Sequence, residues 1–174
     1  EAAATAGLPR YDPPEILETD LSALTLDCAL WGVADPGALR WLDPPPAAAI
    51  GEARQRLGRL DAIDGEGRPT AHGKAIAGLP LPPRLGHMMI RAAEQGFAET
   101  AAEVAVLRAE RGVGGQDSER ELRLRRWRSD RGKRAEGARQ LAARWSRLVG
   151  TRGRDDAMVA ACVALAYPDR VARR

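Results

Sequence analysis

The sequence has 174 residues, enough for one domain or two small ones. Apolar residues make up 44% and aromatic residues 4%, so Ala and Leu must fill most of any core, which favours an α-rich fold. No run of about 18 apolar residues and no signal-peptide pattern occurs, so we expect a cytoplasmic protein without a membrane span. Because the chain begins with Glu1 rather than Met, we also expect it to be part of a longer protein.

Positive charge is concentrated in one stretch of the sequence. The formal net charge is only +3, but residues 119–154 contain 13 Lys or Arg and 4 Asp or Glu. This stretch carries +9, which leaves −6 on the remainder of the chain. Such a distribution is typical of a surface that faces phosphate groups.

The first predicted elements follow a tail or linker over residues 1–13. A helix that ends near Gly32 is expected from four apolar residues at helical spacing: Leu21, Leu24, Cys28 and Trp31. Asp35-Pro36 predicts a short helix that carries Leu39 and Leu42, and Asp43 before three prolines repeats this capping pattern. The next helix is expected to bury one face, formed by Ile50, Ala53, Leu57 and Leu60.

A tight turn is predicted between residues 61 and 70. The run from Asp64 to Arg68 contains two glycines and separates two short segments, which is typical of a small β-hairpin. Thr70 is expected to cap another short helix that ends by Gly78. Helices, a hairpin and one more helix in this order predict a winged-helix domain over residues 14–80.

Residues 81–174 are predicted to form a helical bundle, so the fold class is mainly α: a winged-helix unit with a small β-hairpin, followed by the bundle. Pro80, Pro82 and Pro83 are expected to form a stiff hinge before it. The glycines at 112–115 predict a flexible link. The apolar stripes that mark the helices are Leu85, Met88, Met89 and Ala92; Phe97, Ala101, Val104 and Leu107; Leu124 and Trp127; Ala138, Leu141, Trp145 and Leu148; and Met158, Cys162 and Leu165.

No catalytic or metal-binding constellation is visible. The motifs GxxxxGK(S/T), DEAH, HExxH and GxSxG do not occur, so no catalytic residue is assigned. Asp155-Asp156 is interpreted as a helix cap rather than a metal pair. Cys28 and Cys162 are expected to be buried free thiols, and a zinc site formed by them with the two histidines, His72 and His87, is disfavoured.

The residues predicted to contact nucleic acid lie in the basic stretch and are Arg125, Arg126, Arg128, Arg131, Lys133 and Arg134. Arg outnumbers Lys there, which suits bidentate hydrogen bonds to phosphate. The alternative is an ordinary solvated face of an arginine-rich protein. Trp127 within this cluster is either a base-stacking residue or, as its helical spacing favours, a packing residue.

Several segments in order resemble one known family. The segments PEI (14–16), DL (20–21), LWG (30–32), DP (35–36) and WLDPP (41–45) resemble the start of the accessory region of DEAH/RHA helicases. The segments LGRLD (57–61) and GRPTAHGKAIAGLPL (67–81) resemble the wing and its exit, and PRLGHMM (83–89) resembles the start of the ratchet domain. The two tryptophans at 31 and 41 and the ending AYPDRVA (166–172) are similar to the bacterial HrpB branch; residues 112–155 match least well.

The resemblance implies that this chain is the C-terminal accessory region, winged helix plus ratchet-like bundle, of an ATP-dependent RNA helicase. The parent would hydrolyse ATP with Mg²⁺ in two upstream RecA-like domains, which are partners of this chain together with single-stranded RNA. The winged helix would be a hub between domains, and the bundle would close one side of the RNA channel. No ATP-binding motif has a counterpart here, so the chain alone is expected to be inactive and to hold no cofactor.

Two other functions stay open. A stand-alone winged-helix regulator would bind duplex DNA through the helix at 46–60, which is only moderately basic: Glu52, Arg54, Gln55, Arg56 and Arg59. The negative charge outside the basic stretch disfavours this reading. A protein-interaction adapter without a nucleic-acid role is the second alternative, because the fold alone does not decide function.

Overall fold

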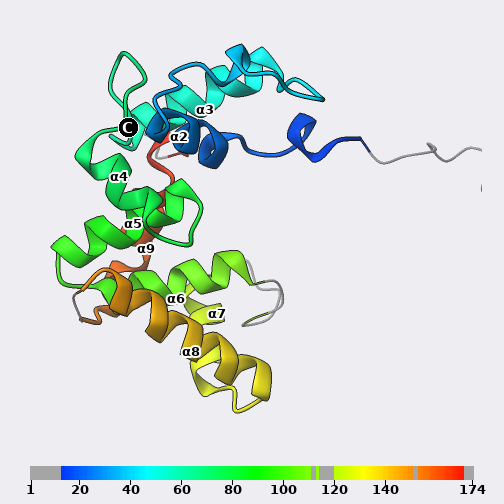
Figure 1. Ribbon diagram of the computed structural model, residues 1–174. Helices are drawn as coiled ribbons and strands as arrows, with labels where there is room; N and C mark the ends of the chain where they lie inside the picture. The colour runs from blue at the N-terminus through cyan, green and yellow to red at the C-terminus, as the bar shows by residue number, and fades with distance from the viewer. Residues whose placement is uncertain (1–12, 111–112, 114–119, 151–152, 171–174) are drawn as a thin grey trace, which may run out of the picture.

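The computed structural model describes residues 13–110, 113, 120–150 and 153–170, and this part of the chain is almost entirely helical, which confirms the mainly α class (Figure 1). The predicted tail at 1–13 and link at 112–115 lie outside the described residues, except for Pro13 and Val113. The α-helices are α2 (Ser22–Leu30), α3 (Ala47–Arg59), α4 (Ala71–Ala77), α5 (Pro83–Glu94), α6 (Ala98–Ala109), α7 (Arg120–Ser129), α8 (Lys133–Leu148) and α9 (Val159–Ala166). Short 3-10 helices are η1 (Glu15–Leu17), η2 (Pro36–Ala38), η3 (Asp156–Met158) and η4 (Pro168–Arg170).

The first half of the chain packs α2 against both α3 and α4. The predicted inward face of α3 is confirmed, because all four of its residues are buried: Ile50, Ala53, Leu57 and Leu60. α3 begins after Pro46 without a side-chain cap, so the predicted cap at Asp43 is wrong; three prolines separate that carboxylate from the first helical turn. Leu57 and Leu60 join a cluster with residues of α2, α4 and the following turn: Leu26, Ala29, Ala62, Ile63 and Ile76.

Where a β-hairpin is predicted, the structure has a tight turn with one antiparallel bridge, between Ile63 and Pro69, and no longer strand between residues 60 and 70. The Oδ1 atom of Asp64 accepts hydrogen bonds from the N–H groups of Glu66 and Arg68, both at 2.9 Å. The pairing does not extend because Pro69 has no N–H and the next residue already caps α4.

The start of α4 is fixed against this turn. The Oγ1 of Thr70 accepts a hydrogen bond from the N–H of Gly73 at 2.9 Å, which confirms the predicted N-cap. The same hydroxyl donates to the carbonyl oxygen of Asp61 at 2.5 Å. A Cβ atom at Gly73 would overlap the carbonyl oxygen of Ala62 and lie 2.8 Å from its carbonyl carbon, so the crossing accommodates only glycine.

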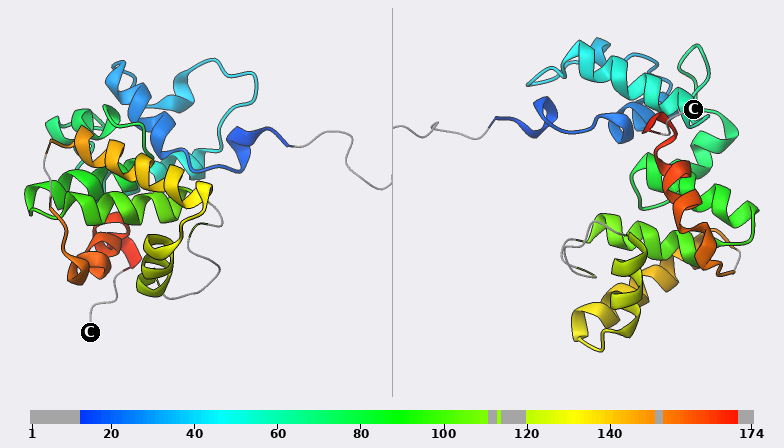
Figure 2. Two further views of the ribbon diagram at one scale, coloured as in Figure 1. Left: turned by 90° about the horizontal axis from the view of Figure 1, so that it is seen from below. Right: turned by 180° about the vertical axis from the view of Figure 1, so that it is seen from behind.

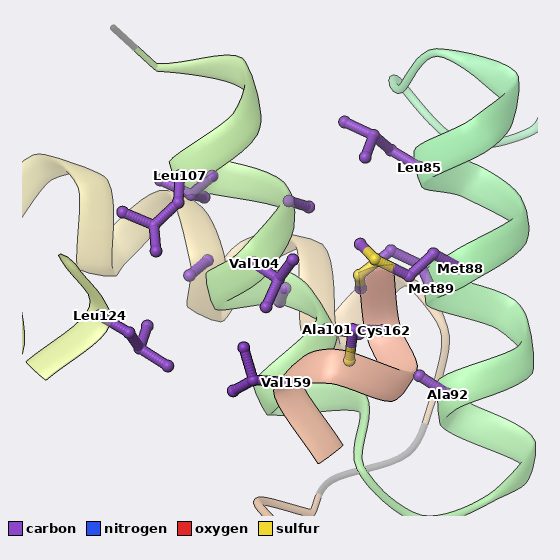
Figure 3. Packing of buried hydrophobic residues seen from close by; sticks show 14 of the residues in the cluster. Leu85, Met88, Met89, Ala92, Ala101, Val104, Leu107, Leu124, Val159 and Cys162 are labelled. Carbon is purple, nitrogen blue, oxygen red and sulfur yellow. The ribbon is translucent and has the colours of Figure 1, made fainter. Parts of the chain in front are cut away.

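The helices from α5 to α9 form a bundle around a second, larger core (Figure 3). α6 packs along α8, and α9 contacts both α5 and α6. The predicted faces of α5 and α6 are buried, with Met88, Met89 and Val104 pointing toward α9 in the close view. Cys162 of α9 lies among them as a buried free thiol, and burial raises the pKa of that thiol to about 12.

The end of the described chain returns to the first half (Figure 2). Arg84 at the start of α5 forms a bidentate ion pair with Asp169 of η4, with N–O distances of 2.6 and 2.9 Å. These hydrogen bonds lower the pKa of Asp169 to about 2. η4 also packs against α3. The two halves are therefore joined twice, by the packing of α4 on α5 and by η4 on α3.

Two predicted core residues of the first half lie in solvent. The prediction that Trp31 continues the buried face of the first helix is wrong, because its side chain is 88% exposed. α2 ends at Leu30, and Gly32, with a φ of 87°, turns the chain away from the core. The predicted short helix with Leu39 and Leu42 is also wrong: η2 stops before Leu39, and Leu42 is 97% exposed.

The buried face of α8 differs from the predicted stripe. Leu148 is 54% exposed, and Leu141 and Trp145 are only partly buried at the edge of the core. The buried side chains of α8 are all small: Ala135, Ala138, Ala142 and Ser146. Small side chains allow α8 to approach α6 closely, which moves the bulkier row to the margin of the contact.

Two histidines meet where α4 packs on α5. The Nε2 atom of His72 lies 2.8 Å from the Nδ1 atom of His87, which also lies 3.1 Å from the carbonyl oxygen of Leu60. His87 is 7% exposed, which fits a hydrogen-bonded core histidine. Burial, with the neighbouring charges of His72 and Arg91, lowers the pKa of His87 to about 4, and burial also lowers the pKa of His72.

We expect the free energy of unfolding to fall as the pH is lowered from about 6.5 toward 4. The pKa of His87 is 6.5 when unperturbed and about 4 in the folded chain, so the unfolded state binds the proton first. Above pH 6.5 this difference in the pKa of His87 contributes about 3 kcal/mol to the free energy of unfolding. That contribution is lost as the pH falls through the folded-state pKa. Urea unfolding at neutral and mildly acidic pH, repeated with His87→Gln, tests this; an equal pH dependence in the variant would contradict it.

Candidate nucleic-acid interface

The predicted nucleic-acid residues lie on α7, on the turn after it and on the first turn of α8. Five of them are exposed, and together they are called the basic face: Arg125, Arg126, Arg131, Lys133 and Arg134. The turn between the helices is held by Arg139, whose guanidinium donates to the carbonyl oxygens of Trp127 and Asp130 at 3.1 and 2.7 Å. The charges are therefore presented by a fixed turn.

The start of α8 adds to the positive potential of the basic face. Lys133 and Arg134 occupy its first turn, and Gly132 at the N-cap offers no side-chain acceptor. Cations in this position oppose the helix dipole, which makes them unfavourable for the helix itself. The same arrangement adds the partial positive charge of the helix N-terminus to that of two cations, which favours the binding of an anion.

Arg128 differs from the other predicted residues because it points into the protein. Its guanidinium donates to both carboxylate oxygens of Asp156 at 2.7 and 2.8 Å and to the carboxylate of Glu103. Glu103 is buried in α6 and also accepts a hydrogen bond from Arg154 at 2.6 Å. The hydrogen bonds to Asp156 and Glu103 raise the pKa of Arg128, and the hydrogen bonds from Arg128 lower the pKa of Asp156. Arg128 thus ties α7 to α6 and η3.

Trp127 is a packing residue, as its helical spacing favours. Its side chain is 1% exposed and belongs to the bundle core. The indole Nε1–H donates to the carbonyl oxygen of Ala135 at 3.1 Å, which links α7 to α8. The interpretation of Trp127 as a base-stacking residue is therefore wrong, because no face of the ring is open to a base.

A pocket of about 360 Å³ lies between α6 and α8. Its charged lining consists of three guanidinium groups and two carboxylates: Arg139, Arg147, Arg154, Glu99 and Glu103. These arginines were not singled out from the sequence, where their only signal is membership of the basic stretch. Because both signs of charge line the pocket, it offers no preference for an anion.

α3 is the helix with which a DNA-binding regulator would contact DNA, but two of its arginines contact other parts of the protein. Arg56 of α3 donates to Asp20 at 2.7 Å and to Ser22 at 3.1 Å. The guanidinium of Arg54 lies against Gly67 of the turn, where an added Cβ would come within 2.8 Å of it. Of the basic side chains in α3, only Arg59 is exposed, which disfavours major-groove recognition by this helix.

Other classes of site find little support in the part of the chain that the structure describes. No group of three or more His, Cys, Asp or Glu side chains there could hold a metal ion. Asp155 caps η3 by accepting a hydrogen bond from the N–H of Ala157 at 3.0 Å, which confirms its predicted role. Among these residues, none of the helices has the length and apolar character needed to cross a bilayer.

Comparison with known proteins places the chain among the helicases. No protein-family model matches it. The ATP-dependent RNA helicase HrpB of Escherichia coli (strain K12) is 35% identical over 167 residues, which cover 92% of this chain and 19% of that protein. The probable ATP-dependent RNA helicase DHR2 of Saccharomyces cerevisiae is 36% identical over 89 residues, covering 51% of this chain and 12% of that protein.

The fold gives the same relationship. The crystal structure of the E. coli DExH-box NTPase HrpB matches 100% of this chain and 21% of its own, with a TM-score of 0.77 and 30% identity. The chain thus spans about a fifth of the length of HrpB. Sequence and fold agree over nearly all of the described residues. The chain therefore belongs to the HrpB-type DEAH/RHA helicases and corresponds to one part of such a protein.

Proposed function

We propose that this chain is an accessory segment of an ATP-dependent RNA helicase, in which it forms one wall of the RNA channel and connects neighbouring domains. Residues 14–80 are assigned to a winged-helix domain and residues 81–174 to a ratchet-like bundle. Hydrolysis of ATP with Mg²⁺ is assigned to RecA-like domains elsewhere in the parent, and the chain alone is inactive. The names of the relatives, which are ATP-dependent RNA helicases, support the assignment of the parent to that class of enzyme.

The basic face is the observation that carries the RNA part of the proposal. Its five cations lie on α7, on the turn after it and on the first turn of α8, and Arg139 holds that turn in place. Arginine and lysine at fixed positions bind phosphates of a single strand without reading its sequence, which suits an enzyme that moves along RNA. In this proposal Arg128 does not contact RNA; it positions α7 through its two carboxylate partners, Glu103 and Asp156.

The mechanism follows from the rigidity of this wall. ATP-driven movement of the RecA-like domains changes their grip on successive nucleotides, while the basic face keeps contact with the backbone. Because α7 is anchored by a buried tryptophan and by the Arg128 ion pairs, phosphate contacts are made without reordering the helix. In this proposal a rigid channel wall resists slippage of the RNA strand between successive ATP-driven steps.

Reversing charge on the basic face is expected to weaken binding of single-stranded RNA by the full-length helicase. The variant Arg125→Glu, Arg131→Glu, Lys133→Glu should raise Kd about tenfold or more and make the salt dependence shallower by about two ions, since each phosphate contact on a single strand releases roughly 0.7 of a counterion. Fluorescence anisotropy at two salt concentrations measures both quantities.

The matched control reverses three exposed cations of the first half: Arg40→Glu, Arg59→Glu and Lys74→Glu. It changes the net charge equally and should leave the salt slope intact. Equal losses in both variants would show a general charge effect and sink the assignment of the basic face. Tight binding of duplex DNA that the control abolishes would favour the DNA-binding regulator, and ATP turnover by the pure 174-residue chain would contradict the placement of the motor elsewhere.

A further inference from the structure

The pocket between α6 and α8 is lined by one face of each helix (Figure 1). Glu99 and Glu103 are one helical turn apart on α6, so their side chains lie on the same face. Arg154, just before η3, completes the lining. The residues of α8 in the pocket follow the same helical spacing and are Arg139, Ala142, Ala143, Ser146 and Arg147. Its volume of about 360 Å³ is sufficient for a small organic group such as a nucleobase.

Two polar side chains in this pocket lack a partner within the described part of the chain. Both oxygens of Glu103 are occupied, one by Arg128 and the other by Arg154. The carboxylate of Glu99, in contrast, makes no hydrogen bond or ion pair with a described residue. Ser146 is only 4% exposed, and its hydroxyl has no described partner either. Buried polar groups are normally satisfied, so this arrangement indicates a polar occupant of the pocket.

Arg147 supplies hydrogen-bond donors beside these two groups. Its Nε–H donates to the carbonyl oxygen of Ala143 at 2.9 Å, and no carboxylate of a described residue forms an ion pair with it. The charge of Arg139 is balanced by Glu136, at 2.9 Å. The available groups are therefore one carboxylate, one hydroxyl and one guanidinium. Their charges cancel, which favours a neutral occupant with N–H donors on one side and acceptors on the other.

We propose that this pocket binds a guanine base of the RNA strand. Guanine is the one standard RNA base with two adjacent N–H donors on its Watson–Crick edge, and these match the two carboxylate oxygens of Glu99. Its O6 and N7 atoms accept hydrogen bonds from a guanidinium, here that of Arg147. The other three bases place an acceptor beside their donor, which would face the carboxylate. This inference rests on the proposed RNA-channel function and adds a base preference to it.

Arg139 connects the pocket to the basic face. It lines the pocket, and its guanidinium also donates to the carbonyl oxygens of Trp127 and Asp130 in the turn after α7. An RNA strand with its phosphates on that turn therefore passes beside the pocket. Unstacked bases of single strands are the usual targets of sequence-specific RNA recognition. We therefore assign the pocket to a base of the bound strand rather than to a free nucleotide.

A comparison of two RNAs tests the proposal without any variant. Short oligouridines that contain either one guanosine or one inosine, which lacks the 2-amino group, are titrated with the full-length helicase and followed by fluorescence anisotropy. The guanosine RNA should bind about tenfold more tightly, because one hydrogen bond to a charged group is lost with inosine. Equal affinities would overturn the proposal and leave the pocket as a solvent-filled cleft.

The variant Glu99→Gln should remove this preference, because an amide offers one acceptor oxygen where the carboxylate offers two. The Kd of the guanosine RNA should rise to that of the inosine RNA. Glu52→Gln, which changes an exposed carboxylate of α3, is the matched control and should keep the preference. Circular dichroism checks that both variants are folded. A guanosine preference that persists in Glu99→Gln would refute the assignment of this residue.

Free guanosine distinguishes the two sources of the base. The preference should disappear only at millimolar guanosine, because a free nucleoside lacks the phosphate contacts of the strand. Its disappearance at micromolar guanosine would overturn the assignment to the strand. The preference is a ratio of two affinities, and charge reversal on the basic face should weaken both RNAs equally. Failure of the guanine pocket and failure of the basic face are therefore told apart.

Discussion

Replacing Trp127 with alanine is expected to destabilise the chain by about 3–5 kcal/mol, the usual cost of removing a buried tryptophan. The ring is 1% exposed in the bundle core, so its loss leaves a cavity that the surrounding helices cannot fill completely. The carbonyl oxygen of Ala135 also loses its hydrogen bond from the indole N–H. Urea unfolding followed by circular dichroism gives the change in free energy directly.

Two comparisons make this result specific. Trp127→Phe keeps most of the buried ring and loses the N–H donor, so it should cost clearly less than the alanine variant. Trp145→Ala removes a partly buried tryptophan at the edge of α8 and should also cost less. If Trp127→Ala left stability intact and reduced RNA affinity instead, the packing role of this residue would be refuted.

Substituting alanine for Gly73 is expected to cost about 3 kcal/mol or more, because the new methyl group would overlap the backbone of the preceding turn. The atom it meets is the carbonyl oxygen of Ala62, which cannot rotate away as a side chain would. Either α4 moves away from the turn or the Thr70 cap on Gly73 is broken. Both outcomes open the cluster around Ile76. A urea titration of the variant reports the loss.

Gly51 and Gly137 provide the matched controls. They lie inside α3 and α8, and a Cβ at either position meets no atom within 4 Å. Alanine there should stabilise the chain by about 0.5–1 kcal/mol, since glycine is a poor helix former. A mild effect of Gly73→Ala, similar in size to these controls, would show that the α4 crossing is looser than the structure indicates.

Apolar periodicity predicted the helices well where large side chains alternate with polar ones. The inward face of α3, ending at Leu57 and Leu60, and the faces of α5 and α6 are confirmed. The caps at Thr70 and Asp155 were also predictable, because these side chains accept from N–H groups only two or three residues away, whereas the cap predicted at Asp43 is wrong. Apolar spacing and helix caps both depend on residues that are close together in the sequence, so the sequence alone reveals them.

The errors arise where a contact between residues far apart in the sequence decides which face of a helix is buried. α8 carries a bulky row and a small row, and only the approach of α6 selects the row of small residues. Trp31 looks like a core residue by spacing, yet the helix ends before it. The β-hairpin was predicted from its glycines, but Pro69 limits it to one bridge.

The candidate site shows the same contrast between features set by nearby residues and features set by contacts far apart in the sequence. The basic stretch was visible as a run of charge, and its members Arg125 and Arg131 are exposed, while their contact with RNA stays a prediction. The inward direction of Arg128 was not predictable, because Glu103 and Asp156 are 25 and 28 residues away in sequence. A run of like charge identifies a region, whereas the identity of each partner is a property of the tertiary structure.

The return of η4 to α3 has a mechanical consequence. A body attached to another at a single place can swing about it, but attachment at two separate places removes that freedom. The segment Pro80–Pro83 therefore does not act as a pivot while Arg84 holds Asp169 and η4 rests on α3. A rotation of either half is therefore transmitted to the other, and the two halves turn together as one rigid body.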